Sequence, residues 1–177
     1  MKQKKDILSG KLIRFSGLFL FAIVLLSGTT EAKTGESNFK YVGYITGKVT
    51  KGTADFYYMK RIDIWNLTLG RYDKSSRESY YARIFFSRDF TPKVGEFPIK
   101  FSYLTKKDTC GGSFIFREKN GNKGSFSHDT KGTITFREFS NTVKGTFSMK
   151  VKDGEGKTVD IKGDFELERG EAFKEQN

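Results

Sequence analysis

Residues 143–167, VKGTFSMKVKDGEGKTVDIKGDFEL, alternate between apolar and polar side chains on both sides of a glycine-rich turn. Counting outward from Val151 and Val159, every second residue is apolar or glycine, and the residues between are Lys, Ser, Thr, Asp or Glu. Alternation with a period of two is typical of strands with one buried face. The stretch therefore predicts a β-hairpin.

The turn and the two faces agree on one register for this hairpin. A three-residue loop, Gly154-Glu155-Gly156, closes on Asp153 and Lys157, and such loops favour a glycine in the left-handed region. The pairs that follow are Val151–Val159, Met149–Ile161, Phe147–Gly163, Gly145–Phe165, Lys150–Asp160 and Lys144–Glu166. Each inward glycine then faces an aromatic ring, and each outer pair joins opposite charges.

The preceding residues, 132–138, alternate in the same way and predict a third strand of the same sheet. A four-residue loop over residues 139–142 would set Phe136 beside Gly145 and Ile134 beside Phe147. We therefore expect a three-stranded meander at the C-terminal end of the domain.

The fold class follows from composition and pattern. Aromatic residues make up 15% of the chain, with 19 glycines and only 2 prolines, which favours an all-β fold of about eight or nine strands. We expect an antiparallel β-sandwich, with a closed lipocalin-like barrel as the alternative. Two features favour the open form: Pro98 marks a strand edge, and a switch of apolar phase at Ile64-Trp65 predicts a bulge or a bend between sheets.

The N-terminal residues resemble an export signal. Lys2, Lys4 and Lys5 are followed by an apolar run over residues 15–26 and by small residues up to Ala32. We expect a secretory signal peptide over residues 1–32 and a single β domain over residues 33–177, with an ordered core at about residues 39–169. The run is shorter than the roughly 18–20 residues that span a bilayer, so an uncleaved membrane anchor is the less favoured alternative. The mature chain is expected to have no transmembrane domain and to be periplasmic or secreted.

Cysteine and charge narrow the class of protein further. Cys110 is the only cysteine, so no intrachain disulfide can form, which favours a bacterial envelope protein over a disulfide-stapled secreted domain. Cys110 is either buried and inert or a partner between chains. The net charge of +11 suits anionic partners such as lipopolysaccharide phosphates, teichoic acids or anionic lipid. The alternative is that the charge serves only solubility, because acidic residues alternate with the basic ones along the strands. No nucleic-acid recognition motif is present, so no specific nucleic-acid partner is expected.

The sequence predicts no enzyme. Ser127, His128 and Asp129 are adjacent on an expected strand, where successive side chains point to opposite faces and cannot converge as a triad. One histidine and one cysteine do not provide the usual zinc ligand sets, and no glycine loop leads into a helix to cradle phosphate. We therefore expect no catalytic residue, no cofactor and no metal.

The C-terminal strands resemble a known group of proteins. Residues 132–135, 144–148 and 159–165 are similar to the C-terminal part of small bacterial envelope lipoproteins, whose β-sandwich domains have no known function. The resemblance implies a sandwich and an envelope location, and it carries over no functional residue. Leu25-Leu26-Ser27-Gly28 also resembles the stretch before a lipidated cysteine, but Thr29 stands in that place, which favours a soluble exported protein.

Two functions remain open. The first is a non-catalytic binding module for an envelope protein, a glycan or a polyanion; the second is a carrier that holds a small ligand inside a barrel. Aromatic and basic side chains that would supply an interaction surface are Tyr57, Tyr58, Trp65, Tyr72, Arg83, Lys100, Lys106 and Lys107. For Trp65 a place in the core is the favoured alternative.

Overall fold

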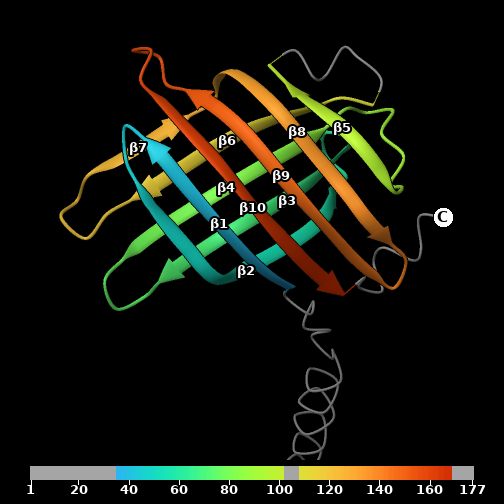
Figure 1. Cartoon of the computed structure of the whole chain (residues 1–177), viewed down its shortest axis with the longest axis horizontal. Coiled ribbons are helices and arrows are strands. Elements are labelled where there is room, and N and C mark those ends of the chain that lie inside the picture. Colours follow the sequence, from blue (N-terminus) through green and yellow to red (C-terminus); the bar gives the residue numbers. More distant parts are fainter. Residues whose placement is uncertain (1–34, 102–107, 169–177) are drawn as a thin grey trace, which may run out of the picture. The chain divides into compact units, whose positions relative to one another are not determined.

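The computed structural model describes residues 35–101 and 108–168, which form ten β-strands and no helix (Figure 1). The strands are β1 (Gly35–Gly43), β2 (Gly47–Met59), β3 (Ile64–Asp73), β4 (Glu78–Phe86), β5 (Gly95–Lys100), β6 (Cys110–Arg117), β7 (Lys123–Phe126), β8 (His128–Phe139), β9 (Thr142–Lys152) and β10 (Thr158–Glu168). Within these ranges there is accordingly no helix long and apolar enough to cross a membrane. The predicted all-β class is confirmed, and the first strand begins slightly before the expected start of the ordered core.

The strands form one continuous sheet that closes on itself. Their order is β4-β3-β2-β1-β10-β9-β8-β5-β6, and β6 pairs again with β4, so that nine strands make a closed barrel while β7 lies beside one end of β6. In Figure 1, β1, β10, β9 and β8 cross at a steep angle in front of β3, β4 and β6. The predicted sandwich is therefore wrong, and the closed barrel that was its alternative is the architecture observed.

Pro98 lies in a strand that has few backbone hydrogen bonds on one of its sides, although the sheet is not open there. It lies in β5 opposite Thr133 of β8. On its other side β5 pairs with β6 through Ile99 and Cys110 alone, which is the one parallel pairing among the described strands. The Cys110 thiol donates to the Pro98 carbonyl oxygen at 3.6 Å. A missing amide hydrogen is tolerated at this seam because few ladder hydrogen bonds are made across it.

The phase switch at Ile64-Trp65 is neither a bulge nor a bend between sheets, as the sequence predicted, but a hairpin. β2 ends at Met59 and β3 begins at Ile64; the amides of Ile62 and Asp63 both donate to the Met59 carbonyl oxygen, at 3.0 and 2.9 Å. Asp63 takes a φ of 57° there. This turn contains no glycine, proline or asparagine, and Asp63 is its one residue of a type that favours turns, so the turn signal in the sequence was weak.

The C-terminal meander of β8, β9 and β10 is confirmed. All six predicted pairs join β9 to β10, and Phe136–Gly145 and Ile134–Phe147 join β8 to β9. At the turn the Asp153 amide donates to the Lys157 carbonyl oxygen at 3.0 Å, and Gly156 has a φ of 85°, as the three-residue loop requires. The loop between β8 and β9 is shorter than predicted, because the pairing shifts at Arg137, which is an extra residue in β8.

Aromatic side chains fill the interior of the barrel. Phe86, Phe90, Phe97 and Phe136 pack together with ring centroids 4.2 to 6.2 Å apart. Cys110 is also fully buried and free, and burial raises the pKa of its thiol, which keeps it in the unreactive protonated form. The side chains with almost no exposed surface include Phe86, Phe114, Phe116, Phe126, Phe136, Leu67, Leu69, Ile84, Ile99 and Ile134. The interior is thus a packed core.

Replacing Gly163 with alanine is expected to destabilise the protein. The added Cβ would lie 2.0 Å from the Asn38 carbonyl oxygen and 2.4 Å from the Phe39 Cβ, so β1 and β10 would have to move apart. Overpacking of this kind costs about 1–3 kcal/mol. Gly154→Ala is the matched control, since nothing lies within 4 Å of a Cβ built there. Thermal unfolding compares the two variants, and equal melting temperatures would contradict this packing.

Candidate functional site

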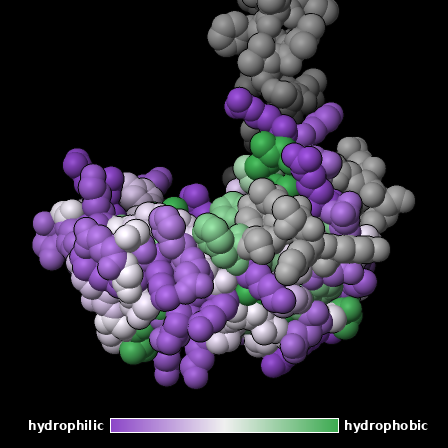
Figure 2. Space-filling view, turned by 90° about the horizontal axis from the view of Figure 1, so that it is seen from above, coloured by the Kyte–Doolittle hydropathy of each residue, from purple (hydrophilic) through white to green (hydrophobic). Residues whose placement is uncertain are grey.

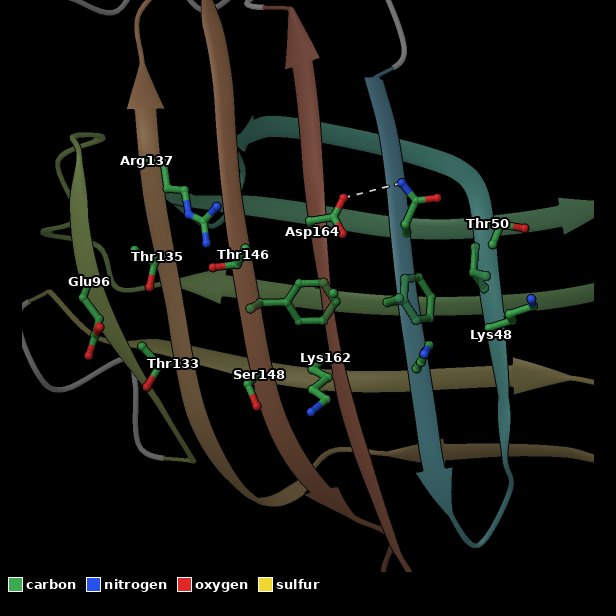
Figure 3. A pocket seen from close by; sticks show the side chains of 16 residues that line it. Lys48, Thr50, Glu96, Thr133, Thr135, Arg137, Thr146, Ser148, Lys162 and Asp164 are labelled. Carbon is green, nitrogen blue, oxygen red and sulfur yellow. Dashed lines mark hydrogen bonds between the residues drawn. The ribbon is translucent and has the colours of Figure 1, made fainter.

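A groove of about 730 Å³ lies over the outer face of the barrel, from β2 across β1, β10, β9 and β8 to β5 (Figure 3). Most of its lining side chains come from the outward positions of these strands. The charged ones are Lys40, Lys48, Glu96, Arg137, Lys162 and Asp164, and hydroxyl groups come from Thr50, Thr133, Thr135, Thr146 and Ser148. The groove is therefore polar, with more cations than carboxylates.

Gly163 of β10 lies in the floor of this groove. It is directly opposite Phe39 of β1 on one side and Phe147 of β9 on the other, and the two rings meet edge-on with centroids 6.1 Å apart. Because Gly163 has no side chain, both rings can fill the space on the inner side of the sheet, and the strands approach one another closely. A glycine at such a position permits a local kink in a curved sheet.

Two bulges flank the groove. β2 carries one extra residue beside Asn38 of β1, where Lys51 has a φ of 53° and its amide donates to the Asn38 Oδ1 at 2.9 Å. β8 carries the other at Arg137, whose side chain extends toward β9 in Figure 3. A bulge bends its strand and redirects a side chain. The outer face between β2 and β8 is thus curved by identifiable residues.

Three lysines form a row across one side of the groove. Lys40 of β1 is directly opposite Lys48 of β2 and Lys162 of β10, and all three are exposed. Figure 3 shows Lys48 and Lys162 extending from their strands. Among the residues that the structure describes, no carboxylate lies within 4.0 Å of the ammonium group of any of the three.

Two lysines elsewhere on the same face do have carboxylate partners. Lys144 lies 3.0 Å from Glu166, and Lys150 lies 3.2 Å from Asp160, in each case across the β9–β10 ladder. Like charges placed directly opposite each other destabilise a sheet. The row Lys48–Lys40–Lys162 is therefore an unfavourable feature for the fold alone, and a bound anion would offset it.

A second row, two residues along the strands, has a different chemistry. It runs Asn38, Asp164, Thr146, Thr135 and Glu96, each directly opposite the next. The Asn38 amide donates to the Asp164 carboxylate at 3.5 Å, as the dashed line in Figure 3 marks. One side of the groove thus presents ammonium groups, and the other presents hydroxyls, an amide, two carboxylates and the Arg137 guanidinium.

The aromatic and basic residues expected to form an interaction surface are spread over the molecule. Tyr57, Tyr72 and Arg83 lie on the outer face of β2, β3 and β4, where Tyr57 and Tyr72 are 45% and 53% exposed. Six residues of β3 separate the rows to which the two tyrosines belong, a distance of roughly 20 Å. The Arg83 Nε is buried without a hydrogen-bond partner. These residues do not form a compact site.

The other predicted surface residues lie elsewhere. Tyr58 and Trp65 are paired across β2 and β3 at inward positions, and Trp65 is 9% exposed and stacks on Phe56 with centroids 5.1 Å apart. Lys100 is exposed at the end of β5, opposite Lys131. Lys106 and Lys107 lie outside the described residues. None of the six that the structure describes lines the groove.

Only a weak pattern in the sequence points to the groove. Lys40, Lys48 and Lys162 each occupy an outward position in an alternating stretch, as solvated lysines commonly do. What sets them apart is that they are neighbours and that none of them has a carboxylate partner among the described residues, whereas Lys150, in the similar row with Lys100 and Lys131, pairs with Asp160. This arrangement depends on the registers of β1 with β2 and of β1 with β10.

The structure also describes the residues of the sequential Ser127-His128-Asp129 motif. The Asp129 carboxylate pairs with the Lys152 ammonium group, which lowers the pKa of that carboxyl, and the His128 ring stacks on Phe101 with centroids 6.4 Å apart. Neither contact prepares a nucleophile. No group of three or more His, Cys, Asp or Glu side chains within residues 35–101 and 108–168 is placed to hold a metal ion.

Comparison with known proteins found no matching family model, no matching curated protein and no matching solved structure. The similarity of residues 132–165 to envelope lipoprotein domains therefore remains a prediction from the sequence.

Replacing Lys40 with glutamine is expected to raise the free energy of unfolding slightly, within about 1 kcal/mol, because it removes the central charge of the row. Lys144→Gln is the matched comparison and should lower it, since the pairs with Glu138 and Glu166 on the two neighbouring strands are lost. Urea unfolding at low and high salt measures both, and the gain from Lys40→Gln should shrink as salt screens the repulsion. A loss of stability in Lys40→Gln would contradict the view that the three lysines repel one another without a compensating partner.

Proposed function

We propose that this protein is an exported, non-catalytic binding module of the bacterial envelope, and that the groove on its outer face binds an anionic ligand. The observation that carries the proposal is the row Lys48–Lys40–Lys162, three exposed lysines that are direct neighbours and have no carboxylate partner among the described residues. A fold gains nothing from such a row, whereas an anion lying on it gains three attractive contacts.

The packed interior supports a surface site over the carrier function. The rings of Phe56, Phe86 and Phe136 are within 5.6 to 5.9 Å of one another between centroids, in the middle of the barrel. A small ligand would have to displace this core, at a cost typical of large changes in packing. The groove is open without any such displacement.

The outer surface also favours a polar ligand. The face seen in Figure 2 is mostly hydrophilic, and its hydrophobic residues form small separate patches. Large exposed apolar side chains such as Val42, Val94 and Phe101 belong to different strands and loops. Broad protein interfaces have apolar centres depleted in charge, which the groove does not resemble.

The envelope location rests on the sequence alone. The basic start, the apolar run over residues 15–26 and the small residues up to Ala32 support export, and the single cysteine supports a bacterial envelope origin.

Binding to immobilised heparin, eluted with a salt gradient, tests the proposed function. The triple variant Lys40→Gln/Lys48→Gln/Lys162→Gln should elute at clearly lower salt, because each lost lysine removes about one released counterion from the salt dependence. The control is Lys60→Gln/Lys74→Gln/Lys119→Gln, which has the same net charge but changes exposed lysines in turns outside the groove. Equal elution of the two triple variants would mean that only net charge matters and would overturn the proposal.

A further inference from the structure

The two rows of the groove differ in the ligand groups they can accept. Lys48, Lys40 and Lys162 continue across β9 and β8 as Ser148 and Thr133, so the first row spans five strands. At about 4.8 Å between strands, this row is roughly 19 Å long. Its lysines can only donate hydrogen bonds and attract negative charge.

The second row carries carboxylate and hydroxyl groups where the first carries ammonium groups. Asp164 and Glu96 are exposed carboxylates, which accept hydrogen bonds and repel anions, and Thr146 and Thr135 between them both donate and accept. A ligand lying in the groove therefore meets three lysines on one side, and on the other it meets groups that bind hydroxyls, with the Arg137 guanidinium next to them. The fitting ligand is anionic along one side and rich in hydroxyl groups along the other.

Polymers with a charged phosphate backbone fit this arrangement poorly. Polyphosphate has no hydroxyl groups along its chain to donate to Asp164 and Glu96, and its charges would lie against both carboxylates. Single-stranded nucleic acid is bound by stacking its bases on exposed aromatic rings. The aromatic residues lining the groove are Phe39 and Phe147, each only 3% exposed, so they offer no stacking surface.

We propose that the ligand of the groove is an acidic polysaccharide whose chain crosses the strands from β2 toward β8. Its carboxylate or sulfate groups lie on Lys48, Lys40 and Lys162, and its hydroxyl groups bind Asp164, Thr146 and Thr135. This inference rests on the proposed function, because it names the class of anion that the same groove binds.

Titration calorimetry at constant ionic strength tests the inference with three probes: short oligogalacturonate, dextran sulfate and linear polyphosphate. At least one acidic glycan should bind more tightly than polyphosphate. Asp164→Asn should then weaken binding of that glycan by about fivefold, because a charge-assisted hydrogen bond becomes a neutral one. The same variant should strengthen polyphosphate binding, since a repulsive charge is removed.

Thr146→Val provides a second variant that keeps the shape of the side chain and suits a strand. It should weaken glycan binding and leave polyphosphate binding unchanged, whereas the control Thr158→Val, at the turn end of β10 and outside the groove, should change neither.

The outcomes separate the two proposals. Suppose that the protein binds heparin through the lysine row. If it then binds polyphosphate as tightly as both acidic glycans, or if Asp164→Asn strengthens the binding of all three probes, the groove is a general anion site. The glycan inference is then overturned, while the proposed function stands. If the lysine row does not contribute to heparin binding and no probe binds, the proposed function fails together with it.

Discussion

A β-sheet with free edges exposes backbone amide and carbonyl groups, and in this protein the pairing of β6 with β4 removes that exposure. Eight residue pairs, from Ser79–Arg117 to Phe86–Cys110, join the two ends of the sheet. The closure forces the sheet to curve, and the curved sheet encloses the aromatic core around Phe86 and Phe136. The seam between β5 and β6 is by contrast a single residue pair beside Pro98.

A second long-range pairing in the same barrel, that of β1 with β10, creates the candidate site on the outside. β1 and β10, which are far apart in the chain, become neighbours, and their register brings Lys40 beside Lys162. Gly163 lets Phe39 and Phe147 fill the inner side at the same level, while the bulges in β2 and β8 curve the sheet around the groove. The core and the groove are therefore two faces of one set of strand pairings, and a change at Gly163 affects both.

The local parts of the fold could be predicted from the sequence, and the closure could not. The β9–β10 register follows from one turn, one apolar face and one charged face that all agree, and β8 follows from the same alternation. Pairing of β4 with β6 or of β1 with β10 joins distant segments, for which alternation gives no register. The groove was missed for the same reason: Lys40, Lys48 and Lys162 look like ordinary solvated lysines until the register makes them neighbours. Tyr58 was assigned to the surface by its residue type, yet its phase in β2 directs it inward. For Trp65 the favoured alternative, a place in the core, is confirmed.

Backbone amide shifts of the ¹⁵N-labelled protein, followed while oligogalacturonate or dextran sulfate is added, test the central claim most directly. The account predicts saturable changes concentrated at Lys40, Lys48, Lys162, Thr146 and Ser148, on four adjacent strands of the groove. Changes gathered instead on the outer face of β2, β3 and β4 around Tyr57 and Tyr72, or spread over all exposed lysines alike, would contradict it.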